Sequence, residues 1–180
     1  MEAAVTESEE ARYAELQAMA LEGARSGDSE LLAAMLRHGL PVDLADARGN
    51  TLLMLASYNG NPDTARLLLE HGADVDRRNN RGQTPLGGVA FKGYDGIVTL
   101  LLEHGADIDA DNGGGMTPLM YAAMFGRTRV GAQLQAHGAS LRRRNRFGVS
   151  AGRLLGISSW ITRLFHLRQP GHSIPGAPSS

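Results

Sequence analysis

A glutamate, a histidine, a glycine and an aspartate lie close together at two places in this chain of 180 residues. The octapeptide Leu-Leu-Leu-Glu-His-Gly-Ala-Asp occupies residues 67–74 and again residues 100–107. A carboxylate beside an imidazole is a pair that both acid/base catalysis and metal binding use. The duplication is therefore either a repeated reactive site or a repeated structural element, and the surrounding spacing has to decide between them.

The dipeptide His-Gly recurs at a constant interval of 33 residues, beginning at His38, His71, His104 and His137. A glycine two residues before a hydroxyl residue has the same period and occurs at Gly49, Gly82, Gly115 and Gly148. A fixed period of this length indicates a repeat protein in which each unit is one supersecondary element. We therefore interpret the octapeptide as part of the scaffold.

Two phrases inside this period carry a family resemblance. Gly-Gln-Thr-Pro-Leu at Gly82 and Gly-Met-Thr-Pro-Leu at Gly115 are each followed by a small-residue segment, a glycine, a Leu-Leu pair and His-Gly-Ala. This pattern resembles the ankyrin repeat, from about Ala20 to Leu167. The resemblance implies an all-α solenoid of helix-turn-helix units with β-hairpin finger loops. It also implies a non-catalytic module that binds a protein, as in small stand-alone ankyrin proteins of bacteria.

The period divides the chain into seven segments. No single unit can bury its apolar face alone, so the repeats are expected to stack between two capping units. We expect an acidic N-terminal arm (1–12), an N-terminal capping unit (13–45), three repeats (46–78, 79–111 and 112–144), a C-terminal cap (145–167) and a disordered tail (168–180). Exposure of Trp160 or Phe165 in the C-terminal cap would favour self-association. The expected state is a monomer, or a weak homodimer through that cap.

Local signals predict where the helices begin and end. Thr84-Pro85 and Thr117-Pro118 are typical helix starts, since the hydroxyl caps a free N–H and proline lacks one; Asn61-Pro62 predicts a third start. The glycines of the His-Gly pairs are expected to end the second helices in the left-handed conformation. The histidines then lie in the last helical turns, and units about 10 Å apart hold them in a row that cannot converge on one metal ion.

Two further patterns suggest ion or phosphate sites. Asp107, Asp109 and Asp111 have the spacing of a calcium loop, but no acidic residue follows Asp111 to complete it. The run 113–115 is all glycine but lacks the Gly-Lys-Ser/Thr of a phosphate-binding loop. We interpret both as finger loops, and we predict no metal, no cofactor and no enzymatic activity.

Charge is divided unevenly along the chain. All 19 acidic residues and nine of the 18 basic residues lie within 1–111, and the other nine basic residues lie within 112–180. The arginine-rich run 142–146, followed by Phe147, suits nucleic acid, and the segment 154–167 has a face compatible with an anionic membrane. A nucleic-acid or membrane adaptor is therefore the alternative function. An acidic protein surface explains the same arginines, and we favour it.

The composition is that of an ordinary globular protein, with 42% hydrophobic residues and no cysteine. The first residues are acidic and carry no apolar run of the kind found in secretory signals. We therefore expect a cytoplasmic location, consistent with a reducing compartment.

Partner-contacting residues are expected where the scaffold leaves side chains free. By the resemblance, these are the positions before the glycine that ends each first helix and those beside the glycine of each finger. Tyr58, Phe91, Met124 and Phe125 form the predicted anchor stripe, unless they pack mainly on neighbouring units. The complete predicted set is Arg25, Arg48, Tyr58, Asn59, Arg78, Asn80, Arg81, Gln83, Phe91, Lys92, Asp111, Met116, Met124, Phe125, Arg144, Arg146 and Phe147.

Some positions depart from the family pattern. Met54, Gly87 and Met120 stand where the family usually has a histidine, so we expect the polar link between units to be missing. Gly87 and Gly88 lie inside a predicted helix, where each costs about 1 kcal/mol relative to alanine. Gly131 and Gln135 replace apolar residues. These departures predict a looser second half of the stack, which a bound partner would stiffen.

Overall fold

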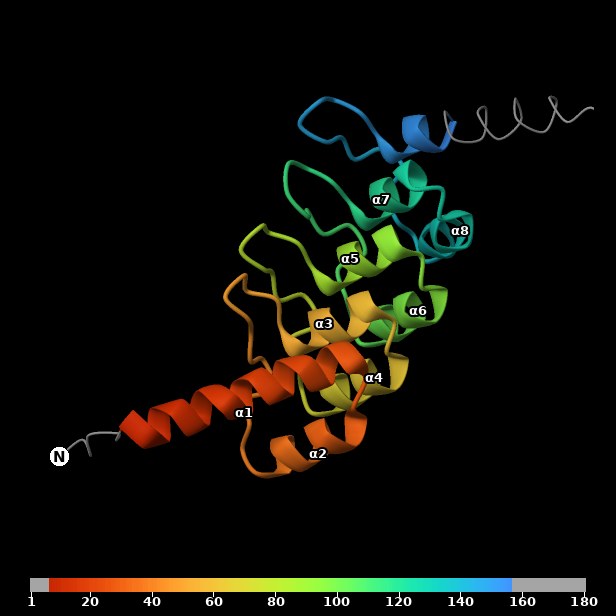
Figure 1. Cartoon of the computed structure of the whole chain (residues 1–180). Helices are drawn as coiled ribbons and strands as arrows, with labels where there is room; N and C mark the ends of the chain where they lie inside the picture. The colour runs from red at the N-terminus through yellow and green to blue at the C-terminus, as the bar shows by residue number, and fades with distance from the viewer. Residues whose placement is uncertain (1–6, 157–180) are drawn as a thin grey trace, which may run out of the picture.

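The computed structural model describes residues 7–156, which form a solenoid of paired helices (Figure 1). The odd-numbered helices pack against one another in one layer, called the inner layer, and the even-numbered helices pack in a second, called the outer layer. The complete helices are α1 (Glu7–Ser26), α2 (Ser29–Arg37), α3 (Leu52–Asn59), α4 (Pro62–Glu70), α5 (Pro85–Lys92), α6 (Asp95–Glu103), α7 (Pro118–Met124) and α8 (Thr128–Ala136). Another helix begins at residue 151. The predicted all-α repeat solenoid is confirmed.

The segment boundaries are only partly covered by these residues. α1 begins at Glu7, so residues 7–12 of the expected arm are the first turns of a long helix. Figure 1 shows that the N-terminal part of α1 extends beyond the stack, and Tyr13 and Leu16 are exposed there. The expected tail, and residues 157–167 of the expected cap with Trp160, lie outside the described residues.

Threonines start the three helices of the inner layer that follow fingers. Oγ1 of Thr51, Thr84 and Thr117 accepts a hydrogen bond from the N–H three residues later, at 3.2–3.3 Å. This bond satisfies one of the free N–H groups of a first helical turn. The predicted Thr84 and Thr117 caps are confirmed.

Histidines end the helices of the outer layer. Nδ1 of His38, His71, His104 and His137 donates to the carbonyl oxygen four residues earlier, at 2.8–2.9 Å. The glycine that follows each histidine has φ between 83° and 92°, the left-handed conformation that glycine adopts without strain. The imidazoles therefore terminate helices, and the described residues contain no group of three or more side chains that could hold a metal ion.

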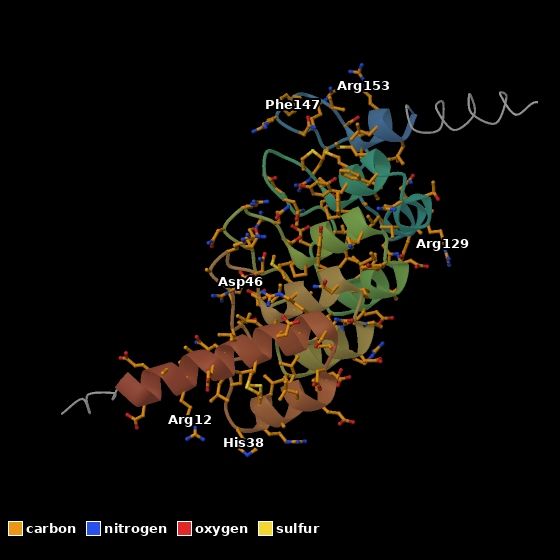
Figure 2. All side chains as sticks on the ribbon, viewed as in Figure 1. Arg12, His38, Asp46, Arg129, Phe147 and Arg153 are labelled. Atoms are coloured by element: carbon orange, nitrogen blue, oxygen red, sulfur yellow. The ribbon has the colours of Figure 1, made fainter. Side chains whose placement is uncertain are left out.

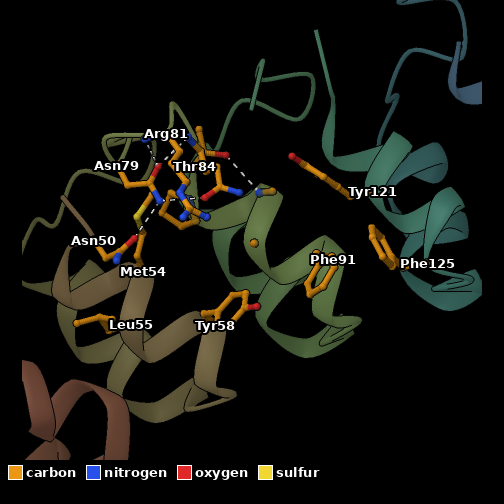
Figure 3. A pocket seen from close by; sticks show the side chains of 14 residues that line it. Asn50, Met54, Leu55, Tyr58, Asn79, Arg81, Thr84, Phe91, Tyr121 and Phe125 are labelled. Atoms are coloured by element: carbon orange, nitrogen blue, oxygen red, sulfur yellow. Dashed lines mark hydrogen bonds between the residues drawn. The ribbon is translucent and has the colours of Figure 1, made fainter. Parts of the chain in front are cut away.

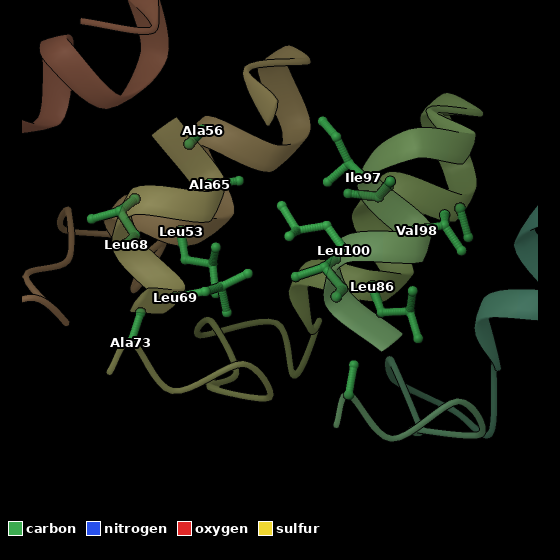
Figure 4. Packing of buried hydrophobic residues seen from close by; sticks show 14 of the residues in the cluster. Leu53, Ala56, Ala65, Leu68, Leu69, Ala73, Leu86, Ile97, Val98 and Leu100 are labelled. Carbon is green, nitrogen blue, oxygen red and sulfur yellow. The ribbon is translucent and has the colours of Figure 1, made fainter. Parts of the chain in front are cut away.

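The core repeats with the period of the sequence. Leu53, Leu86 and Leu119 at the start of the inner helices are fully buried, and so are Leu68, Leu101 and Leu134 in the outer helices. Figure 4 shows Leu53, Leu68 and Leu86 among the clustered buried side chains of two successive units. Each buried leucine contributes about 2 kcal/mol relative to an exposed one. The stack is thus stabilised mainly by contacts that cross between units.

The residues before α4 and α8 link neighbouring units. Asn61 does not cap α4 through its side chain, which corrects the sequence interpretation. Its Nδ2 instead donates to the carbonyl oxygens of Ala24 and Arg25 at the end of α1, at 3.1 and 2.9 Å. Arg127, the residue before α8, acts in the same way, since its Nε donates to the carbonyl oxygen of Phe91 near the end of α5 at 2.9 Å. These bonds satisfy carbonyls that the end of a helix leaves free.

Aspartates form a second chain of links on the loops. A carboxylate oxygen of Asp43, Asp76 and Asp109 accepts from the N–H of residue 74, 107 and 140, respectively, in the next unit, at 2.9–3.2 Å. Burial raises the pKa of Asp76, although the N–H of Asp107 opposes that rise. Of the aspartates whose spacing suggested a calcium loop, Asp109 forms one of these links, Asp107 accepts from the N–H of Asp109, and Asp111 accepts from N–H groups of its own finger.

The fingers are tight hairpin turns. In the first to fourth fingers, a backbone hydrogen bond runs from the N–H of residue 46, 79, 112 or 145, respectively, to the carbonyl oxygen four residues later, at 2.8–3.0 Å. Between residues 7 and 156, the only β-bridges are the isolated pairs Ala45 with Thr51 and Arg144 with Ser150. The expected β-hairpins thus lack extended strands.

Asn112 supplies a polar link where the sequence predicted none. Its Oδ1 accepts from both the N–H and Oγ1 of Thr84, at 2.7 and 3.0 Å, and its Nδ2 donates to Ala110. The side chain fits because residue 87 is glycine: a Cβ on Gly87 would lie 2.0 Å from Oδ1. Gly87 therefore makes room for a buried amide, and a different polar link joins the two units where the family's usual histidine is absent.

None of the helices within residues 7–156 combines the length and the apolar character that crossing a bilayer requires.

Candidate partner-binding surface

A hollow of about 350 Å³ lies on the inner layer, between the second finger and helices α3, α5 and α7 (Figure 3). Its apolar walls come from the helices and its polar rim from the finger. The lining residues are Asn50, Met54, Leu55, Tyr58, Asn79, Arg81, Gln83, Thr84, Pro85, Gly87, Gly88, Phe91, Tyr121 and Phe125. An apolar concavity with a few polar groups has the composition of a binding site.

Three aromatic rings form one wall of the hollow. Tyr58 and Phe91 are stacked, with ring centroids 6.3 Å apart and planes 7° apart, and Phe125 meets Phe91 edge-on at 4.4 Å. Tyr58 and Phe125 remain 44% and 43% exposed. The rings thus position one another across three units while leaving apolar area uncovered, which combines the packing and the interface interpretations.

Glycine backbone forms the floor beside this wall. Gly87 is buried under the side chain of Asn112, and a Cβ on Gly88 would lie 3.3 Å from Cδ2 of Tyr58. Larger residues at these two positions would occupy the space between the rings and the finger. The glycines that appeared from sequence only to weaken α5 therefore also shape the hollow.

Amide side chains organise the polar rim. Oδ1 of Asn79 accepts from the N–H groups of Arg81 and Gln83, both at 3.0 Å, and its Nδ2 donates to Asn50 and Gln83. These bonds fix the turn of the second finger and hold residues 81 and 83 on the rim. The guanidinium of Arg81 and Nε2 of Gln83 have no hydrogen-bond or ion-pair partner within residues 7–156.

Lys92 adds a positive charge at the end of α5. Its Nζ lies 4.9 Å from the ring centroid of Tyr58 and 5.8 Å from that of Tyr94. Contacts of this kind hold an ammonium over a ring face and favour an ordered position. One end of the aromatic wall is therefore cationic.

Comparisons with known proteins decide the family. The model of the family described as ankyrin repeats (3 copies) matches residues 19–112 and 79–145. This chain belongs to the ankyrin repeat family. Ankyrin repeats generally mediate protein–protein interaction. An ankyrin repeat protein of Pseudomonas aeruginosa is 51% identical over 41 residues, which are 23% of this chain and 24% of that protein. The aligned region thus spans about a quarter of that relative's length.

The ankyrin register places the predicted anchor residues unevenly. Tyr58, Phe91 and Phe125 line the hollow, whereas Met124 is 53% exposed and outside it. The ring contacts pass from Phe91 to Phe125, although Met124 is the residue at the matching position of the repeat; α7 ends at Met124, one residue earlier than the matching helices. The predicted stripe therefore shifts by one residue in the last repeat.

Several predicted polar contacts are occupied within the protein. Arg25 forms ion pairs with Glu22 and Asp46, at 3.5 and 3.6 Å. Burial alone would raise the pKa of Asp46, but hydrogen bonds from Asn50 and Arg48 and the charge of Arg25 hold that pKa below its ordinary value. Arg25 thus helps to join α1 to the first finger.

Other predicted residues join fingers or helices. Nη1 of Arg78 donates to the carbonyl oxygen of Asp111 in the next finger, and Nδ2 of Asn80 donates to Ala47 in the previous one. Asn59 donates to Leu55 within α3 at 2.8 Å. Arg78 and Asn80 thus join neighbouring fingers, whereas Asn59 bonds within its own helix.

A second hollow of about 310 Å³ continues from the first along the fingers. It adds Ala47, Arg48 and Asn80 to the rim residues shared with the first hollow. Arg48 and Arg81, both predicted from sequence, therefore lie along one continuous groove.

The remaining predicted residues lie toward the C-terminal end of the stack. Met116 is half-buried beside Asn145, whose Nδ2 lies 3.4 Å from its sulfur. Asp111 accepts from the N–H groups of Gly113 and Gly115 and so shapes the third finger. Both lie outside the two hollows.

The last finger carries an exposed ring. Phe147 is 72% exposed and projects at the far end of the molecule (Figure 2), with the guanidinium carbon of Arg146 4.7 Å from its centroid. Nη1 of Arg144 donates to Gly148 at 2.8 Å. This finger is a separate surface from the aromatic hollow.

Sequence reasoning missed part of the hollow. Met54 and Tyr121 line it from the helices, and Asn50 and Asn79 line it from the fingers. Met54 stands at the position where the family usually has histidine, which was a usable signal. Tyr121 had none, because its contribution depends on how α7 packs on α5.

Proposed function

We propose that this protein is a non-catalytic interaction module that binds another protein in the aromatic hollow and along the adjoining fingers. The observation that carries the proposal is the exposed ring wall of Tyr58, Phe91 and Phe125 beside a hollow of about 350 Å³. Aromatic side chains lose little entropy on contact and bury large areas, so they are frequent interface anchors. Binding would regulate, inhibit or assemble the partner in the cytoplasm.

The chemistry of the polar side chains also favours binding over catalysis. The Glu-His pairs, which first suggested a reactive site, have imidazoles that terminate helices. The aspartates accept backbone N–H groups. The ionisable side chains in the hollow are those of Arg81, Tyr58 and Tyr121, which do not form a nucleophile-base pair.

The arginine-rich finger is the surface that a nucleic-acid or membrane adaptor would use. Arg143 lies 3.8 Å from a carboxylate oxygen of Asp109, and Arg144 donates to Gly148. Two arginines of this finger are therefore partly committed to the fold. A protein partner bound in the hollow accounts for the exposed aromatic rings as well, which an adaptor that uses only this finger would not.

Affinity capture from cells of the source organism tests the proposal. We expect wild type to retain at least one protein whose affinity for the triple variant Tyr58→Ala, Phe91→Ala, Phe125→Ala falls by about thirtyfold or more, because the loss of even one interface anchor costs about 2 kcal/mol or more. Circular dichroism and thermal unfolding would verify that the variant folds.

A matched control removes three exposed apolar side chains elsewhere, by Tyr13→Ala, Leu16→Ala and Leu141→Ala. It should capture the same proteins as wild type. Retention of every captured protein by the hollow variant, or equal loss in both variants, would contradict the proposed surface. Salt-sensitive binding to duplex DNA or anionic vesicles, abolished when residues 142–144 and 146 become serine, would support the adaptor instead.

A further inference from the structure

The hollow offers hydrogen-bond donors that nothing within residues 7–156 uses. The guanidinium of Arg81 has five N–H groups and Nε2 of Gln83 has two, and neither group has a partner in this part of the chain. The side-chain oxygens on the same rim are occupied: Oε1 of Gln83 and Oδ1 of Asn50 both accept from Asn79. The unpaired groups of the rim are therefore donors, which a hydrogen-bond acceptor of the ligand would satisfy.

The charge of the hollow also favours an acceptor, in particular an anionic one. Its lining includes no aspartate and no glutamate, and its one charged residue is Arg81. Lys92 adds a second cation behind Tyr58, and Arg48 a third along the adjoining groove. The nearest carboxylate on the first finger, Asp46, is paired with Arg25 and bonded to Asn50. A carboxylate from outside would meet uncompensated positive charge.

The apolar lining of the hollow suits an apolar side chain of the ligand beside that carboxylate. Tyr58 and Phe125 leave ring area exposed, Phe91 is half-buried between them, and the absence of a side chain at Gly88 leaves space between the rings and the rim. The hollow also runs on into the groove between the first two fingers, through shared rim residues. An elongated site with one apolar recess suits an extended polypeptide better than a compact small molecule.

We propose that the hollow receives an extended segment of the partner, with a large apolar side chain over Gly88 between the rings and an Asp or Glu within about two residues that pairs with Arg81. This inference rests on the proposed function and adds the chemistry of the partner to it. An acidic-apolar peptide is thus the recognised class. A segment rich in lysine or arginine would be repelled by the same rim.

A displayed library of random twelve-residue peptides is the probe. Panning on the purified full chain should enrich peptides that carry Asp or Glu within two positions of Leu, Met, Phe or Trp. Panning on Arg81→Glu should shift the enrichment toward Lys or Arg. Enrichment without an acidic preference, or the same preference on both proteins, would overturn the inference.

The carboxylate contact is measured by a mutant cycle on one enriched peptide, by fluorescence anisotropy. Changing its acidic residue to the amide should weaken binding to wild type by about fivefold, as expected for a solvent-exposed ion pair, but should have little effect on Arg81→Gln. Equal effects on the two proteins would show that Arg81 is not the partner of the carboxylate.

The recess is tested with two glycine-to-alanine variants. Gly88→Ala places a methyl group 3.3 Å from Cδ2 of Tyr58 and should weaken the peptide by several-fold, whereas Gly96→Ala in α6, with no atom near the new methyl group, should not. Equal affinities for both would exclude the recess as the apolar site. If the capture experiment succeeds while the library result fails, the module binds a partner of different chemistry, so the two failures are distinguishable.

Discussion

Gly87→Ala should destabilise the protein by about 2 kcal/mol, although alanine is the better helix former by about 1 kcal/mol. The new Cβ would lie 2.0 Å from Oδ1 of Asn112, so the amide must leave its site. Its departure removes both hydrogen bonds to Thr84 and leaves a buried N–H without a partner, a loss of about 1–3 kcal/mol. Urea unfolding followed by circular dichroism measures the difference.

The matching variant Asn112→Ala makes this expectation specific. Alone it should cost a similar amount, because Thr84 loses the same two bonds. In the double variant the added methyl group no longer meets the amide, so Gly87→Ala should then cost little or should stabilise α5. The coupling between the two sites should be about 2 kcal/mol. Additive effects would mean that the glycine and the amide are independent.

Leu101→Ala should cost about 3 kcal/mol of folding free energy. Leu101 is fully buried in α6, at the centre of the stack, and a leucine-to-alanine change in such a site typically costs 2–5 kcal/mol through lost burial and the cavity left behind. Because each unit is stabilised by its neighbours, the whole unfolding transition should move to lower urea concentration.

Leu102→Ala, one residue further along α6, provides the control. Its side chain is half-buried at the edge of the core, so the same truncation should cost clearly less. Equal losses at residues 101 and 102 would contradict the assignment of the buried stripe. A separate transition confined to the second half of the chain would instead support the looser half that the glycines predicted from sequence.

The repeated features of the fold could be predicted because the sequence repeats them. Thr84 and Thr117 are caps by residue type alone, and the histidines and glycines that end the outer helices recur every 33 residues. The link from Asn112 to Thr84 could not be predicted. It depends on one repeat lacking a Cβ at residue 87 and the next repeat turning an amide inward.

The candidate site was predictable to a similar degree. Residue type and register identified Tyr58, Phe91 and Phe125, because aromatic side chains stand out at positions where the scaffold makes no demand. Register could not tell which polar side chains would be occupied. Arg25 and Arg81 are both arginines that register placed on the binding surface, yet the side chain of Arg25 pairs with Asp46 and that of Arg81 has no partner in residues 7–156. That difference arises from the three-dimensional arrangement of the fingers.

Site-specific photo-crosslinking in cells of the source organism tests the central claim, that a partner protein occupies the aromatic hollow. One variant carries benzoylphenylalanine at Phe125 in the ring wall, and the other at Ala132, an exposed residue of α8 in the outer layer. We expect a discrete cross-linked protein from position 125 that position 132 does not give. The same product from both positions, or a product from position 132 alone, would contradict it.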